Sequence, residues 1–240
     1  MRIAVRGALY RTFFSIHRPG RSVRMILLYH SVGSASPLAE SVETFRTQMR
    51  YVARWFRVVR VSEFLGAAAA DPGGNLAAVT FDDGFADNAT IARSILEEVG
   101  VPGTFFVVTG LLGAAMRTSA GPFTLMAPTQ VKALATAGHE VGAHSVTHVP
   151  LTELPTPQAR REVVDSRRYL EDLLGRPVTS FSYPKGRLNH QVQQFVQEAG
   201  YRQAVGSRPR GFADAPVDPF ALPRMAIRDY VRLAGRRPRV

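Results

Sequence analysis

The chain has 240 residues, of which 45% are hydrophobic, and this length and composition suit one sizeable globular domain. It contains no cysteine, which excludes disulfides, thiolate metal ligands and a cysteine nucleophile. The chain has 30 basic and 19 acidic residues, for a net charge of +11. It contains no run of eighteen apolar residues, so no transmembrane helix is predicted.

The positive charge is concentrated at the two ends of the chain. No acidic residue precedes Glu40, and arginines are frequent in residues 1–24 and 229–240. Two explanations stay open, either arginine-rich solvated termini or attraction to an anionic membrane or polymer. Nucleic-acid binding is not predicted, because no motif accompanies the charge. The uncharged stretches near the N-terminus are too short for a convincing signal peptide, which predicts a cytoplasmic location, with the inner membrane surface as one option.

From Met25 onward, short apolar runs alternate with helical patterns, which is typical of βα units around a parallel sheet. Strands are predicted at 25–29, 56–61, 76–81, 103–108, 139–143, 178–182, 201–205 and 220–224. Helices are predicted at 42–55, 61–65, 128–138, 157–174 and 189–199, with a further helix capped by Asp87 or Asn88 and stopped by Gly100. Residues 110–123 are expected to form an irregular excursion, and Trp55 is expected in the core. No repeat or linker divides the α/β pattern, so we predict one catalytic domain over 25–228 between basic extensions at 1–24 and 229–240.

Two acidic residues, Asp82 and Asp83, follow the predicted strand 76–81, in the run Thr80-Phe81-Asp82-Asp83-Gly84. Reactive groups of parallel α/β folds collect where strands end, and adjacent side chains point in different directions. One carboxylate could therefore bind a metal while the other faces a water molecule. A turn-forming pair is the alternative explanation.

A second motif, His144-Ser145-Val146-Thr147-His148, follows the predicted strand 139–143. Histidines four residues apart lie on one face of a helix or tight turn, and two imidazoles with a carboxylate suit zinc and related divalent metals. Two unrelated surface histidines are the alternative, which the nearby acidic pair makes less favourable. His139 is interpreted as structural, and His17 and His190 as exposed.

These motifs resemble those of the polysaccharide deacetylases, carbohydrate esterase family 4 with its NodB-like homology domain. The resemblance spans about residues 25–228. It includes Thr104-Phe105-Phe106-Val107, Gly138-His139-Glu140-Val141 and Phe181-Ser182-Tyr183-Pro184-Lys185-Gly186. It implies a distorted (β/α)7-type barrel and metal-dependent removal of acetyl groups from sugars.

Carried over by position, the resemblance implies a metal held by Asp83, His144 and His148, with Asp82 as general base. The metal is expected to be Zn²⁺, with Co²⁺ or Ni²⁺ as options. The loop of Tyr183, Pro184 and Lys185 is expected to contact substrate. A backbone N–H near Lys185 would stabilise the oxyanion, and the Tyr183 side chain would line a sugar subsite.

The chain departs from the family pattern in two places. The loop beginning at Ser182 lacks the arginine that orients the base in relatives, and Arg224 could replace it by pairing with Asp82. No histidine follows His190, so the usual C-terminal acid is missing. Leu28-Tyr29-His30-Ser31, however, resembles the early Tyr-His of the poly-N-acetylglucosamine deacetylase branch, which implies His30 as the acid. A buried structural role is the alternative for His30.

The sequence therefore predicts a metal-dependent hydrolase that removes N-acetyl groups from N-acetylhexosamine units of a polysaccharide, oligosaccharide or glycolipid. Two alternatives remain. The same site could cleave O-acetyl esters or other amides, or the chain could be a catalytically inactive, glycan-binding relative.

Overall fold

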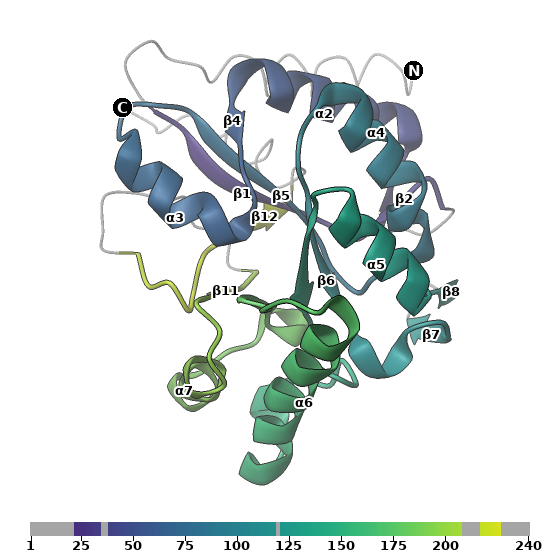
Figure 1. Cartoon of the computed structure of the whole chain (residues 1–240), viewed down its shortest axis with the longest axis vertical. Coiled ribbons are helices and arrows are strands. Elements are labelled where there is room, and N and C mark those ends of the chain that lie inside the picture. The colour runs from purple at the N-terminus through teal and green to yellow at the C-terminus, as the bar shows by residue number, and fades with distance from the viewer. Residues whose placement is uncertain (1–21, 35–37, 119–120, 208–216, 227–240) are drawn as a thin grey trace, which may run out of the picture.

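The computed structural model describes residues 22–34, 38–118, 121–207 and 217–226. Its centre is a curled sheet of parallel strands, surrounded by helices (Figure 1). The strands run in the order β11-β10-β9-β6-β5-β1-β12, and β4 pairs with β5 beside this path. Their bounds are β1 Arg24–Tyr29, β4 Arg57–Val58, β5 Leu76–Phe81, β6 Thr104–Val107, β9 Glu140–Ala143, β10 Ser180–Ser182, β11 Gln203–Val205 and β12 Met225–Ala226.

The two ends of this sheet approach each other through the segment that precedes β12. Leu222 forms an isolated parallel bridge with Val205 of β11, and three residues later Met225 pairs with Leu27 of β1. The sheet therefore curls towards closure, which confirms the prediction of a single-domain, distorted (β/α)7-type barrel.

Helices connect successive strands and cover the outside of the sheet, as parallel pairing requires (Figure 1). The α-helices are α2 Val42–Trp55, α3 Val61–Ala70, α4 Ile91–Val99, α5 Pro128–Thr136, α6 Thr156–Leu174 and α7 His190–Glu198. Short 3-10 turns are η1 Ala86–Ala89, η2 Thr109–Leu111, η3 Leu151–Glu153 and η4 Pro184–Gly186. Two small pairs complete the described elements, β2 Ser31–Val32 with β3 Ala39–Glu40, and the antiparallel hairpin of β7 Ala115–Thr118 and β8 Gly121–Thr124.

Strand β5 shows why the sequence forms this sheet. All six residues of Leu76–Phe81 are buried, as expected for a central parallel strand with packing on both faces. At its carboxyl end the Phe81 ring stacks on Phe105 of β6, with 4.7 Å between centroids. The strand end, and with it Asp82, is thereby anchored in the hydrophobic core.

Several predicted elements differ in the structure. The strand expected at 56–61 is reduced to β4, and the helix expected at 61–65 extends to Ala70. The excursion at 110–123 contains the β7–β8 hairpin, and the last strand lies at 225–226 instead of 220–224. The core prediction for Trp55 is wrong, because its side chain is 47% exposed at the C-terminal end of α2, whereas the neighbouring Phe56 is buried.

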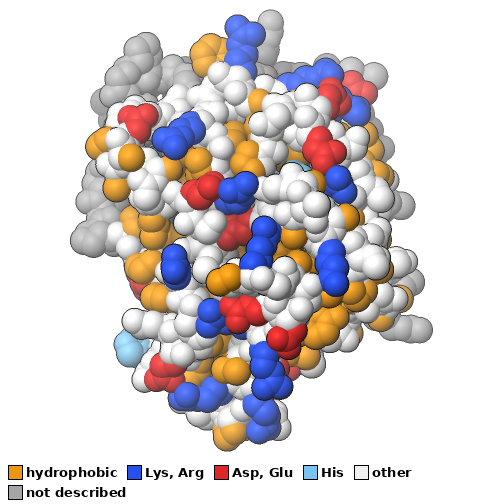
Figure 2. Space-filling model, viewed as in Figure 1, with side chains coloured by type: hydrophobic (Ala, Val, Ile, Leu, Met, Phe, Trp, Pro, Cys, Tyr) orange, Lys and Arg blue, Asp and Glu red, His pale blue; other side chains and the backbone are white. Residues whose placement is uncertain are grey.

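The surface seen in Figure 2 carries basic and acidic side chains interspersed, without one large patch of either sign. Ion pairs such as Arg46–Glu98 and Arg160–Glu198 are exposed on the protein surface. The basic segments at 1–21 and 229–240 lie outside the described residues, so their association with an anionic surface stays a prediction. In the described part of the chain, none of the helices has the length and hydrophobicity that crossing a bilayer requires.

Candidate active site

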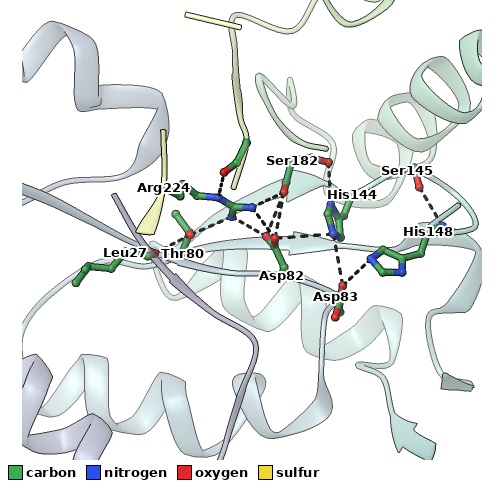
Figure 3. Close-up of polar contacts among 10 residues, drawn as sticks. Leu27, Thr80, Asp82, Asp83, His144, Ser145, His148, Ser182 and Arg224 are labelled. Carbon is green, nitrogen blue, oxygen red and sulfur yellow. Dashed lines mark hydrogen bonds and ion pairs between the residues drawn. The ribbon is translucent and has the colours of Figure 1, made fainter. Parts of the chain in front are cut away.

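The two aspartates, His144, His148 and Arg224 lie close together at the carboxyl end of the parallel strands (Figure 3). His30 follows β1, the Asp82–Asp83 pair follows β5, His144 follows β9, and Ser182 ends β10. Arg224 immediately precedes β12. Because all these strands are parallel, their carboxyl ends share one edge, and the sequence motifs converge there as predicted.

Asp83, His144 and His148 form a compact group of possible metal ligands, whose ligand atoms all lie within 4.8 Å of one another. Asp83 Oδ1 is 3.1 Å from His148 Nε2 and 3.4 Å from His144 Nε2. This oxygen is buried and has no hydrogen-bond partner among the described residues. A buried carboxylate oxygen facing two imidazole nitrogens calls for a positive charge between them.

The tautomer of His144 also favours a metal ion between these three side chains. Its Nδ1 lies 2.8 Å from the backbone carbonyl of Ser182, which can only accept, so Nδ1 carries the proton. In the neutral ring Nε2 then presents a lone pair towards Asp83 Oδ1. Two imidazoles and a carboxylate, with one imidazole oriented by a backbone carbonyl, fit a divalent cation such as Zn²⁺.

The turns that carry these ligands have strained backbone conformations. The described residues include four non-glycine residues with positive φ, namely Asp83 at 71°, Ser145 at 64°, His148 at 65° and Lys185 at 56°. All four belong to the motifs at this edge of the sheet. Backbone strain of this kind persists only where surrounding contacts enforce it, and it is commonly found at functional sites.

Glu162, on helix α6, holds the turn between the two histidines. Its carboxylate accepts hydrogen bonds from the backbone N–H groups of Val146 and Thr147, at 2.8 and 2.9 Å, and from the Thr147 hydroxyl at 2.8 Å. Ser145 Oγ accepts a further bond from the N–H of His148. The sequence analysis missed Glu162, because its position on a predicted helix is equally typical of a surface residue.

Asp82 lies beside the ligand group and is held by Arg224 (Figure 3). The guanidinium donates to both carboxylate oxygens, through Nη1 to Oδ1 at 2.8 Å and Nη2 to Oδ2 at 2.6 Å. Its remaining N–H groups donate to Thr80 Oγ1, Ser182 Oγ and the carbonyl of Gly206. All five donors of this buried arginine are therefore satisfied, and the predicted pairing with Asp82 is present.

Electrostatics favour an ionised Asp82. Burial opposes its ionisation, but the charges of Arg224 and His144 and the Arg224 hydrogen bonds outweigh burial, so the pKa of Asp82 lies below its ordinary value. For His30, burial lowers the pKa, and the charges of Asp82 and Asp83 only partly offset this effect. His30 thus lies within electrostatic reach of both carboxylates.

The loop after β10 differs from its prediction in one respect. The Tyr183 side chain is fully buried and its hydroxyl donates to the carbonyl of Phe220, so it cannot line an open sugar subsite. Pro184 is also buried, whereas Lys185 is exposed at the turn. Gly186 has a φ of 63°, and a Cβ there would approach Ser207 Cβ to 2.4 Å, so this tight turn requires glycine.

Two other histidines lie where they were expected. His139 is buried, and its Nδ1 accepts a hydrogen bond from the N–H of Gly103, which is a structural contact. His190 is exposed at the start of α7. His17 lies outside the described residues.

The family follows from comparison with known proteins. A family model described as polysaccharide deacetylase matches residues 69–204, which is more than half of the chain. The chain belongs to the polysaccharide deacetylase family. Residues 82, 83, 144 and 148 all lie inside the matched region, whereas His30 and Arg224 lie outside it.

Curated relatives agree with this assignment. YxkH of Bacillus subtilis, a protein named for the same family, is 26% identical over 84% of this chain and 70% of its own length. A peptidoglycan-N-acetylglucosamine deacetylase of Bacillus cereus is 26% identical over 59% of this chain and 62% of its own length. The match thus spans less than two thirds of the Bacillus cereus enzyme, and only 23% of the Listeria monocytogenes enzyme PgdA.

Solved structures show the same fold. The Streptococcus pyogenes deacetylase PplD superposes with a TM-score of 0.74 over 86% of this chain and 92% of its own. IcaB from Ammonifex degensii superposes with a TM-score of 0.78 over 89% and 96%. Each is 24% identical in sequence, so these similarities establish the barrel. Together, the comparisons support deacetylase activity on a polysaccharide or peptidoglycan.

Proposed function

We propose that this protein is a metal-dependent N-deacetylase of N-acetylhexosamine units in a glycan or glycolipid. The observation that carries the proposal is the arrangement of two carboxylates with separate environments. Asp82 is neutralised by Arg224, whereas Asp83 faces two imidazoles with an otherwise unpaired oxygen. Such a division suits a base beside a metal site.

In the proposed reaction, Asp82 accepts a proton from the water molecule whose oxygen attacks the acetyl carbon. Its two oxygens offer about four lone pairs, and the described donors are two guanidinium N–H groups and the shared Ser182 hydroxyl. One lone pair thus remains for the water. Oδ2 lies 3.9 Å from His144 Nε2, which keeps this water next to the ligand group.

A divalent cation held by Asp83, His144 and His148 would supply Lewis acidity, which polarises the acetyl carbonyl and makes water more acidic. The chain's own contribution to the oxyanion is a backbone N–H at the strained turn of Lys185. A fixed N–H donor aimed at developing negative charge stabilises the tetrahedral state without reorganisation.

His30 completes the proposed reaction as the acid. As the tetrahedral carbon collapses, its C–N bond breaks, and the leaving nitrogen takes a proton from the His30 imidazole. The products are acetate and a free amino group on the sugar. Burial lowers the pKa of His30 and the charges of Asp82 and Asp83 oppose this shift. The protonated imidazole, which those two carboxylates favour, is the form that acts as the acid.

The substrate class in this proposal is supported by named relatives that deacetylate N-acetylglucosamine in peptidoglycan. The early His30 favours the poly-N-acetylglucosamine deacetylase branch over the peptidoglycan enzymes.

The deciding experiment measures acetate release from N-acetylglucosamine oligomers and from a simple acetyl ester, with and without chelator, alongside elemental analysis. We expect about one metal per chain, with chelator-sensitive release from the oligomers. Release from the ester alone would favour an O-acetyl esterase. Bound metal without release from either substrate would contradict the deacetylase proposal, and absence of both would point to an inactive glycan-binding relative.

A further inference from the structure

The stretch that supplies the base and one metal ligand also holds the backbone around His30. Its first residue, Asp82, donates its N–H to the carbonyl of Tyr29 at 3.0 Å. Five and six residues later, Asp87 and Asn88 bond to the segment 30–32. The connection from β5 through η1 therefore holds both sides of His30.

Asn88 contacts His30 directly. Its side chain is completely buried, and its amide nitrogen donates to the His30 carbonyl at 2.8 Å. The amide oxygen of Asn88 has no hydrogen-bond partner among the described residues. Burying an amide with one half unsatisfied is costly, so Asn88 is a poor choice for stability alone.

Asp87 holds the two residues that follow His30. Its Oδ2 accepts the Ser31 hydroxyl at 2.5 Å, and its Oδ1 accepts the N–H of Val32 at 3.2 Å. Because the proton of Ser31 points to Asp87, the contact between the Ser31 and Ser34 hydroxyls at 2.8 Å must be donated by Ser34. A short chain of hydrogen bonds thus ends on Asp87.

The helix-cap prediction for these residues is wrong, which removes the simplest explanation for them. Helix α4 begins after Thr90, and both residues lie inside η1 with their side chains bonded to 30–32. Their polar groups serve a segment more than fifty residues earlier in the sequence.

We propose that Asp87 and Asn88 are positioning residues for His30, so that the functional motif extends from Thr80 to Asn88. The inference rests on the proposed function, because it assigns them an effect on catalysis that passes through the His30 imidazole. Asn88 fixes the His30 carbonyl and Asp87 fixes the next two residues, which together set the direction of the ring. Small displacements of a catalytic group reduce rates strongly, so this support should be visible in kinetics.

A merely structural role would lower all activities together, whereas a role through His30 depends on the leaving group. An amide needs a proton on its departing nitrogen, but 4-nitrophenyl acetate has a leaving group that does not. The measurement is therefore kcat/KM on N-acetylglucosamine oligomers and on 4-nitrophenyl acetate, for metal-loaded protein.

His30→Ala should reduce amide cleavage by about 100-fold or more and ester cleavage by less than about 5-fold. Asn88→Ala and Asp87→Ala should show the same selectivity, with amide losses of about 10-fold to 100-fold. Asp87→Asn should restore most of the amide activity, because its carbonyl can accept from Val32 and its amide can donate to Ser31. Ser31→Ala, which removes one of the two bonds to Asp87, provides a milder variant with the same expected selectivity if Asp87→Ala does not fold.

Asn75→Ala is the matched control. It replaces the same residue type as Asn88→Ala and also loses side-chain bonds to backbone, from the N–H of Val23 and to the carbonyl of Trp55, but at the opposite end of β1. It should leave the amide-to-ester ratio unchanged.

The double variant His30→Ala/Asn88→Ala separates the two proposals. If Asn88 acts through His30, the double variant should be no slower on the amide than His30→Ala. Equal losses on both substrates for Asn88→Ala and Asp87→Ala, with a selective loss for His30→Ala, would overturn the positioning role alone. Equal losses on both substrates for His30→Ala would overturn the acid role, and the inference with it.

Discussion

Replacing Arg224 with methionine tests the energetics of the site most directly. Arg224 is 1% exposed and Asp82 is 4% exposed, so the ion pair is removed from water on both sides. The variant leaves Asp82 with the Ser182 hydroxyl as its remaining described side-chain donor, and the carbonyl of Gly206 loses the Nε donor. Removing one partner of a buried pair typically costs about 3–5 kcal/mol, because the other charge stays buried.

The assay is urea or thermal unfolding in chelator, so that metal binding does not contribute to the measured stability. For a chain of this size the expected loss of unfolding free energy lowers the thermal unfolding midpoint by roughly 6 to 20 °C. Arg46→Met is the control, since the Arg46–Glu98 pair has a similar distance of 2.9 Å but side chains 37% and 40% exposed. Breaking this exposed pair should lower stability far less than Arg224→Met, because water screens both charges.

A double variant shows whether the unpaired charge is the cause. With Asp82→Asn in the background, Arg224→Met no longer leaves a carboxylate without a partner, so the two losses should be clearly less than additive. The reasoning is refuted if Arg224→Met is as mild as Arg46→Met, or if the two losses simply add.

Three further predictions concern the metal site and the barrel. Asp82→Asn should keep the metal but lose at least about 100-fold in acetate release, whereas His144→Ala should lose the metal. Elemental analysis and an acetate-release assay check both variants. Normal turnover of Asp82→Asn, or full metal content in His144→Ala, would contradict these roles. Glu162→Ala should weaken metal binding by about 10-fold or more in a chelator competition, because the histidine turn loses its support; unchanged affinity would show that the turn holds itself. Gly142→Ala would place a Cβ 2.5 Å from Phe106 Cε1 and should cost about 1–3 kcal/mol in urea unfolding. Gly66→Ala, with nothing within 4 Å of its Cβ, should instead gain up to about 1 kcal/mol; a loss there as large as at Gly142 would refute the steric argument.

The fold was predictable where a strand or helix carries a strong local pattern. The continuous apolar run at 76–81 and the long periodic segment at 157–174 are observed as β5 and α6 with nearly the predicted bounds. The prediction failed at 56–61, because only Arg57–Val58 pair as a strand and Val61 already begins α3. Val59 and Val61 are buried in the hydrophobic core, and burial alone does not distinguish a strand from the start of a helix. The β7–β8 hairpin was missed, since a sequence rich in glycine, alanine and serine carries little strand signal.

The site was predictable where its residues follow one another closely. Asp82 with Asp83, and His144 with His148, are short motifs at strand ends, and local spacing suffices to find them. Glu162 and Asn88 could not be found this way, because their partners lie 15 or more residues away and their residue types have ordinary local explanations. The pairing of Arg224 with Asp82 could be predicted only indirectly, because the loop beginning at Ser182 lacks the arginine that relatives carry there.

The position of Arg224 in the barrel links Asp82, the proposed base, to the closure of the sheet. It reaches Asp82 across 142 residues of sequence and occupies space beside the small side chain of Ser182. Its Nε–H also donates to Gly206, next to the point where Leu222 bridges Val205. Residues 222–226 therefore join the two ends of the sheet and, through Arg224, also hold Asp82 in place.

The proposed metal ligands depend much less on this closing segment. Asp83 follows β5, while the histidine turn is held by Glu162 on α6 and by the Ser182 carbonyl. Contacts to residues 217–226 support Asp82 but include none of these bonds. Loosening the closing segment should therefore displace Asp82 before it weakens the proposed metal site, so the two halves of the candidate site differ in what supports them although they are in contact.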